Sequence, residues 1–174
     1  GHMVHKYLST KEDCEIVTTD FRWPTKEFKD FIIDFWYGQE GNYIINCIGA
    51  INQKTNGFQI NIDLPIWLDE NIDYNLSGCK VIHPGTDSGV GEYGKSKDKV
   101  EKYILEKGCM THIIKTSIIG HELDSDNSLL EWFLNSEDEV WGYSKTYWNG
   151  NTTLQWAKIC YDLMINWDNN EKLT

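Results

Sequence analysis

Apolar residues recur along this chain with two different spacings, which separate short strands from amphipathic helices. Apolar and β-branched runs predict strands over Glu15–Thr19, Tyr43–Ile48, Lys80–His83 and His112–Ser117. Apolar residues three and four positions apart predict helices over Lys26–Trp36, Ile60–Leu68, Lys95–Lys107 and Thr153–Ile165. Strands that alternate with helices are typical of βαβ units. We therefore expect an α/β fold, a Rossmann-like parallel sheet with helices on both faces.

The length favours a single domain. A chain of 174 residues can bury one core but is too short for two ordinary domains. We expect one Rossmann-like domain over residues 1–174, in which residues 120–174 contribute the substrate side. Gly1-His2-Met3 resembles the remnant of a cleaved expression tag. In the alternative interpretation, residues 2–8 form a helix of the fold and Gly1 ends a glycine-rich turn.

Charge and composition exclude several classes of function. A net charge of -11 disfavours phosphate backbones, and no basic cluster adjoins an aromatic platform, so we expect no nucleic-acid partner. The apolar runs are too short to span a membrane and no signal-peptide pattern opens the chain, so we expect no membrane partner and a cytoplasmic location. The cysteines form no CxxC pair, and His112, His121 and Glu122 lack the spacing of a helical zinc site. We expect no metal.

A tyrosine and a lysine share the inward face of one predicted helix. Tyr93 and Lys97 are one turn apart and fall on the apolar stripe of Val100 and Ile104. The outward positions are Lys95, Lys99 and Lys102. The same Y-x-x-x-K spacing occurs at Tyr7/Lys11 and Tyr103/Lys107 without that context. A nearby ammonium stabilises a phenolate and so favours proton transfer. The alternative is a lysine whose stem covers a packed tyrosine.

Polar and small residues follow the predicted strands, where parallel sheets bind ligands. These loops are Asp20-Phe21-Arg22, Gly49-Ala50, Pro84 to Ser88 and Gly120-His121-Glu122. Asp20 suits a ribose 2′-hydroxyl and Arg22 suits a 2′-phosphate, so NAD and NADP both stay open. The alternative for Asp20 is an ordinary helix or turn cap.

Several segments, in this order, resemble the extended short-chain dehydrogenase/reductase family, in the branch of dTDP-4-dehydrorhamnose reductase and nucleotide-sugar epimerases. Tyr93 and Lys97 open a helix after a strand that ends Pro-Gly-Thr86-Asp87. The other similar segments are Tyr43 to Ala50, Asn61 to Pro65, Ile114 to Gly120 and Trp148 to Leu154. The resemblance runs from about Cys14 to Leu163, and it is the order of the motifs that carries it.

The resemblance implies a Thr86–Tyr93–Lys97 triad that acts with NAD or NADP on a nucleotide-sugar substrate. Tyr93 would exchange a proton with the sugar oxygen, Thr86 would hydrogen-bond to that oxygen, and Lys97 would hold the ribose and tune Tyr93. The implied cofactor-binding residues are Asp20, Arg22, Asn46, Gly49, Ala50, Tyr93 and Lys97. The implied substrate-binding residues are Ser117, Trp148 and Asn151. Hydride would come from the nicotinamide, because no side chain supplies it.

The sequence also departs from the family. It lacks the first strand and the G-x-x-G-x-x-G turn whose backbone N–H groups meet the diphosphate. Gly89 to Gly94 spell G-x-G-x-x-G, but the intervening loop and Glu92 make this a false match. The spacer from Thr86 to Tyr93 is short. We expect either a pared-down member of the family or a functional polypeptide longer than this sequence.

Three functions follow from these observations. The first is NAD(P)H-dependent reduction of a nucleotide-linked 4-keto-6-deoxy sugar. The second is epimerisation, or combined epimerisation and reduction, of such a substrate. The third is a non-catalytic relic or interaction module, favoured by the missing glycine-rich turn and opposed by the Tyr93/Lys97 stripe. A homodimer stays open as well.

Overall fold

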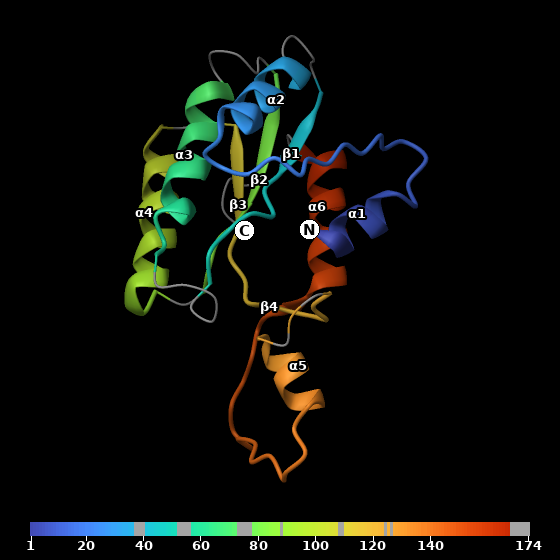
Figure 1. The fold of residues 1–174 in the computed structure, drawn as a ribbon, viewed down its shortest axis with the longest axis vertical. Coiled ribbons are helices and arrows are strands. Elements are labelled where there is room, and N and C mark those ends of the chain that lie inside the picture. The colour runs from blue at the N-terminus through green and yellow to red at the C-terminus, as the bar shows by residue number, and fades with distance from the viewer. Residues whose placement is uncertain are drawn as a thin grey trace.

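A small parallel sheet forms the centre of the molecule in the computed structural model (Figure 1). The strands are β1 (Tyr43–Ile45), β2 (Lys80–Pro84) and β3 (Thr111–Ile114), in the order β1-β2-β3. Ile44 is paired with Val81, and Ile82 with His112. The structure describes residues 1–36, 41–51, 57–72, 78–87, 89–107, 110–123, 125 and 127–167. The predicted loop residue Ser88 lies outside this range.

Helices cover both faces of the sheet, because the side chains of β2 alternate between them. Val81 packs with α2 (Lys26–Trp36) and α3 (Ile60–Ile72). Its neighbour Ile82 packs on the opposite face with α1 (His2–Leu8) and α6 (Thr153–Ile165). The helix α4 (Gly91–Lys107) lies beside α3 and packs through Val100 and Ile104 on Ile113 of β3. The expected α/β fold, with a parallel sheet between helices, is confirmed at this level.

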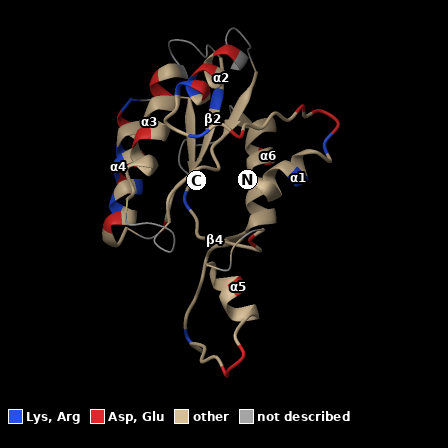
Figure 2. Cartoon of the chain, in the orientation of Figure 1, with Lys and Arg blue, Asp and Glu red and all other residues tan. Residues whose placement is uncertain are grey.

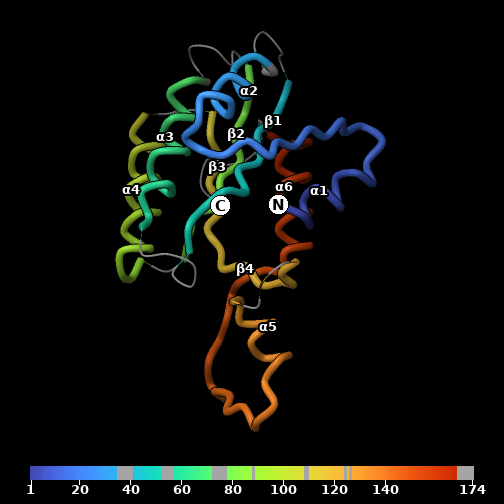
Figure 3. The backbone as a smooth tube through the Cα atoms, in the orientation of Figure 1, coloured from blue at the N-terminus to red at the C-terminus, as the bar shows by residue number. Residues whose placement is uncertain are grey.

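The chain leaves this body after β3. The strands β4 (Ile118–Ile119) and β5 (Asn151–Thr152) form a separate two-stranded parallel ladder. Between them lies α5 (Leu129–Leu134), which has no buried residue. Figure 3 shows this segment projecting away from the sheet before the chain returns through β5 into α6. The projection starts at the carboxyl end of β3, the edge at which the sequence places the candidate site.

One predicted strand is wrong. Residues 15–19 form no ladder with any described strand. Ile16 packs on the α1 and α6 side of the core, but Val17 is 36% exposed. The segment therefore has neither a ladder partner among the described strands nor the alternating burial of a strand, since Val17 and Thr18 are both exposed. The prediction failed because the strand preference of β-branched residues depends strongly on burial and on a neighbouring strand.

The predicted helices are present with adjusted ends. The helices α2 and α6 have the predicted bounds, α3 extends to Ile72, and α4 begins four residues earlier, at Gly91. Residues 2–8 form α1, whose Val4 and Leu8 are buried against α6. Within the described ranges, no helix has the length and apolar character needed to cross a membrane.

Candidate active site

The helix α4 carries a buried lysine on its inward face. Lys97 is 6% exposed, and Val100 and Ile104 on the same stripe are fully buried. Lys95, Lys99 and Lys102 are exposed, and Figure 2 shows the basic residues of α4 along its outer side. The helical spacing therefore predicted the orientation of α4 correctly. A lysine in this position calls for a functional explanation, since unpaired lysines are rarely buried.

The ammonium group of Lys97 reaches the end of the central strand. Its Nζ donates a hydrogen bond of 2.9 Å to the carbonyl oxygen of Pro84, the last residue of β2. Burial lowers the pKa of Lys97 to about 8. A neutral carbonyl offsets only part of the free energy needed to bury the charge. The ammonium therefore has N–H groups that can donate further hydrogen bonds at this edge of the sheet.

Thr86 and Tyr93 meet next to this lysine. Thr86 is 7% exposed and lies two residues beyond Pro84, where its hydroxyl is hydrogen-bonded to the phenol of Tyr93. The Tyr93 ring is half-buried and contacts Phe58 edge to face, with ring centroids 5.9 Å apart. The three residues of the expected triad therefore gather at the carboxyl end of β2.

The electrostatics of Tyr93 differ from the sequence-based expectation. We expected the ammonium of Lys97 to lower the pKa of the phenol. Burial instead raises the pKa of Tyr93, the Thr86 hydrogen bond opposes this rise, and the charge of Asp87 adds to it. The physical reason is that Lys97 donates to the Pro84 carbonyl rather than to the phenol. Tyr93 is therefore held in its protonated form at neutral pH.

A second cluster fixes the turn after β1, where three cofactor-binding residues were expected. Asn46 is 4% exposed, and both ends of its amide have partners inside the protein. Its Oδ1 accepts a hydrogen bond of 2.9 Å from the Ile48 N–H, and its Nδ2 lies 3.0 Å from Nδ1 of His83. The Asn46 side chain thus shapes the turn and is not itself free to bind a ligand.

The far end of the same turn is held by Asn61 of α3. Its Oδ1 accepts from the Ala50 N–H at 2.7 Å, and its Nδ2 donates to the Ala50 carbonyl at 2.9 Å. A Cβ atom at Gly49 would lie 3.2 Å from the same Oδ1, so the close approach favours glycine there. The amide of Asn61 also lies 3.4 Å from Oγ of Ser96 in α4. Residues 46–50 are therefore fastened to both α3 and β2.

A pocket of about 150 Å³ opens between this turn and α1. It is lined by Gly1, His2, Met3, Val4, Asn46, Cys47, Pro84, Ile118, Thr153 and Trp156. Pro84 takes part in the pocket wall and also accepts the Lys97 hydrogen bond. The pocket therefore lies at the carboxyl ends of β1 and β2, the place where parallel sheets bind ligands, but Thr86, Tyr93 and Lys97 do not line it.

The expected substrate-binding residues lie on the projecting side. The hydroxyl of Ser117 donates to Oδ1 of Asp87 at 2.7 Å, next to Thr86 in the chain. Asn151 donates to Oγ1 of Thr116 at 3.0 Å, so its side chain joins β5 to the end of β3. The Trp148 ring lies against Gly150, where a Cβ atom would come within 2.1 Å of it. Trp148 remains 54% exposed, which leaves part of its ring open to a ligand.

Asp20 and Arg22 are not brought into this cluster. Both are exposed on the irregular segment before α2. No contact among the described residues joins either side chain to Thr86, Tyr93 or Lys97. Their expected role at the adenosine end of a cofactor remains a prediction, now without the strand that was expected to position Asp20.

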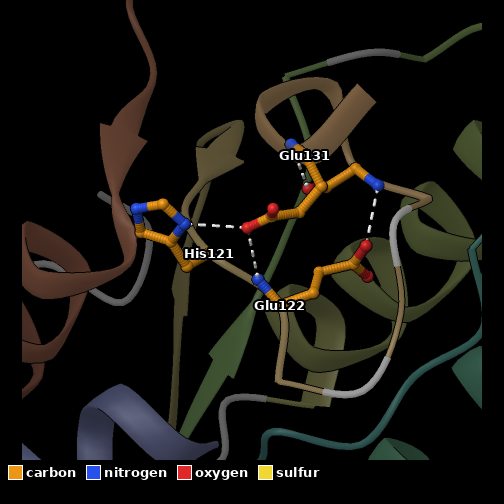
Figure 4. Close-up of polar contacts among 4 residues, drawn as sticks. His121, Glu122 and Glu131 are labelled. Carbon is orange, nitrogen blue, oxygen red and sulfur yellow. Dashed lines mark hydrogen bonds and ion pairs between the residues drawn. The ribbon is translucent and has the colours of Figure 1, made fainter. Parts of the chain in front are cut away.

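A polar cluster at the base of the projection has a structural explanation. Figure 4 shows the His121 ring and the Glu122 N–H both pointing at the carboxylate of Glu131, at 2.8 Å and 3.3 Å. Glu122 in turn accepts from the N–H of Ser128, which caps α5. Among the described residues, no cluster of three or more His, Cys, Asp or Glu side chains is suited to a metal ion.

Sequence reasoning missed two residues that shape the site. His83 was placed in the predicted strand but given no role, and Asn61 entered only as part of a helix motif. A histidine ending an apolar strand is a usable signal, because a buried imidazole needs hydrogen-bond partners. The identity of those partners, Asn46 for His83 and Ala50 for Asn61, depends on tertiary contacts.

Comparison of the chain with protein-family models gives no match, and comparison with curated proteins gives none either.

Proposed function

We propose that this chain reduces a nucleotide-linked 4-keto-6-deoxy sugar with NADH or NADPH, on a Rossmann-like fold. The proposal rests on one observation above the others. Thr86 and Tyr93 are hydrogen-bonded at the carboxyl end of β2, with the buried ammonium of Lys97 directed at the same strand end. This is the residue set that the family resemblance assigns to such a reduction.

The protonation state of Tyr93 fits the role of proton donor in a reduction. A carbonyl that accepts hydride at carbon needs a proton at oxygen, and the donor must hold that proton at neutral pH. Burial raises the pKa of Tyr93, so the phenol keeps its proton. Thr86, hydrogen-bonded to the phenol, would donate to the same sugar oxygen once its hydroxyl turns towards the substrate. Tyr93 is the proposed acid and Thr86 its hydrogen-bonding partner.

The chain offers residues suited to a nicotinamide cofactor, which when bound supplies the hydride. Lys97 has a single acceptor, Pro84, among the described residues, and its remaining N–H groups suit ribose hydroxyls. The backbone of residues 46–50 borders the adjoining pocket at Asn46 and Cys47. The choice between NAD and NADP stays open, with Asp20 and Arg22 as the residues that would decide it.

The projecting side is the proposed place for the nucleotide-linked sugar. Ser117 is tied to Asp87 beside Thr86, so the start of the projection is joined to the triad loop. Trp148 presents an exposed ring on which a base or sugar can stack. Asn151 contributes by holding β5 in place through Thr116 rather than by a free amide.

The test is turnover of a dTDP-linked 4-keto-6-deoxy sugar with NADH or NADPH labelled with deuterium at the nicotinamide. We expect one cofactor oxidised per sugar reduced, with deuterium at C4 of the product. Solvent deuterium at carbons next to the carbonyl, without cofactor oxidation, would identify an epimerase instead. The absence of both reactions would contradict the proposal and favour a non-catalytic module.

A further inference from the structure

A chain of buried hydrogen bonds links the central strand to the turn after β1. It runs from the His83 ring in β2 to the Asn46 amide and from there to the backbone N–H of Ile48. His83 is 1% exposed, so water does not substitute for these contacts. At its other end, the turn is clamped by Asn61 at Ala50.

The chemistry of these groups determines which nitrogen of His83 carries the proton. A backbone N–H only donates, so the Asn46 atom facing Ile48 is the oxygen Oδ1. The Asn46 atom facing His83 is then the NH₂ group, which also only donates. Nδ1 of His83 is therefore the acceptor, and the neutral ring carries its hydrogen on Nε2, which is buried and has no hydrogen-bond partner among the described residues. Burial and the charge of Lys97 both lower the pKa of His83, which agrees with a neutral ring.

We infer that His83 is a positioning residue: through Asn46 it fixes the backbone of residues 46–50 in the conformation that a dinucleotide cofactor contacts. This inference rests on the proposed function, because it names the cofactor as the ligand of that turn. His83 itself touches no part of the proposed reaction. It acts by holding the Asn46 amide in one orientation.

Two variants distinguish the effect of the His83 hydrogen bond from the effect of the volume of its ring. In His83→Asn, the new Oδ1 stands near the place of Nδ1 and accepts from Asn46 as before. His83→Leu fills a similar volume but leaves the Asn46 NH₂ group buried without an acceptor. We expect His83→Leu to weaken binding of the preferred cofactor, NADH or NADPH, roughly tenfold, with kcat changed far less than KM for the cofactor. His83→Asn should restore binding. Equal cofactor affinity in wild type and His83→Leu would overturn the inference.

Two nuclear magnetic resonance measurements on the full chain do not depend on the cofactor. Nitrogen shifts of the wild-type ring at neutral pH should show hydrogen on Nε2, and hydrogen on Nδ1 would overturn the inference. Hydrogen exchange at the Ile48 amide should accelerate in His83→Leu and not in His83→Asn. If wild type binds neither dinucleotide, the proposed function fails, and hydrogen exchange at the Ile48 amide then decides the inference. Faster exchange in His83→Leu supports the positioning of the turn by His83. Unchanged exchange overturns it. If His83→Leu does not fold, the inference is decided by hydrogen exchange at the Ile48 amide in His83→Asn and by the position of the hydrogen on the wild-type His83 ring.

Discussion

Nζ of Lys97 lies 2.9 Å from the carbonyl oxygen of Pro84, so an ammonium group on the inward face of α4 is hydrogen-bonded to the last residue of β2. The contact places the charge at the strand end, two residues before Thr86 in the chain. It also leaves the charge mostly desolvated, since Lys97 is 6% exposed. A buried charge that weakens the fold is a common property of functional sites.

Lys97→Met should therefore stabilise the protein at neutral pH. The pKa of Lys97 falls from 10.5 to about 8 on folding, and this difference corresponds to about 3 kcal/mol at pH values below both. Methionine keeps the length of the side chain but leaves the Pro84 carbonyl without its donor, so we expect a net gain of roughly 1–3 kcal/mol. Chemical denaturation measures the change.

The stability gained in Lys97→Met should decrease as the pH rises. Between the folded pKa of about 8 and the unfolded pKa of 10.5, the native state of wild type binds fewer protons than the unfolded state. Wild-type stability then rises with pH across this window, and its difference from Lys97→Met shrinks. Lys99→Met, on the exposed face of α4, is the control and should be neutral at every pH. A Lys97→Met variant less stable than wild type would mean that the ammonium has further partners.

Tyr93→Phe should reduce turnover by about 10²–10⁴-fold, because it removes the proton donor and leaves the ring packed on Phe58. Cofactor affinity should stay unchanged, and stability should fall by about 1 kcal/mol or less from the lost Thr86 hydrogen bond. Tyr103→Phe is a matched control with the same Y-x-x-x-K spacing, since its hydroxyl bonds to Glu70 on the surface. The steady-state turnover rates of the two variants are compared. Equal activity in both would mean that Tyr93 contributes only to packing.

Gly150→Ala should displace Trp148 and weaken binding of the nucleotide-sugar. A Cβ atom at Gly150 would stand 2.1 Å from the Trp148 ring and 2.6 Å from the Ser117 carbonyl, so the ring must move. Loss of one stacked contact corresponds to about 1–3 kcal/mol, or a rise of roughly tenfold in KM for the sugar substrate. Cofactor affinity should not change. Gly142→Ala, with no atom within 4 Å of its Cβ, is the control. An unchanged KM in Gly150→Ala would remove Trp148 from the substrate site.

The features predictable from the sequence were those carried by local periodicity. The stripe of Lys97, Val100 and Ile104 gave the orientation of α4 correctly, because a helix repeats its faces over a short span. The parallel strands followed from their alternation with helices. The pairing of Thr86 with Tyr93 was implied by the family resemblance, and the two side chains are hydrogen-bonded.

The features that escaped prediction depend on partners distant in the chain. Residues 15–19 have the β-branched composition of a strand, yet they form no ladder with any described strand. The Asn46–His83 contact joins positions 37 residues apart, and the direction of the Tyr93 pKa shift follows from where Lys97 finds its acceptor. The helix α5 was not predicted, although Ser128 and Glu131 match a capping box.

The most direct test of the central claim is calorimetric titration of NADH and NADPH into the purified chain and into Lys97→Met. The account predicts saturable binding of at least one dinucleotide to wild type. It predicts weaker binding to Lys97→Met, in which the donor to the ribose is lost while the fold is more stable. Equal binding in both proteins, or no binding of either dinucleotide to wild type, would contradict the assignment of this strand end as a cofactor site.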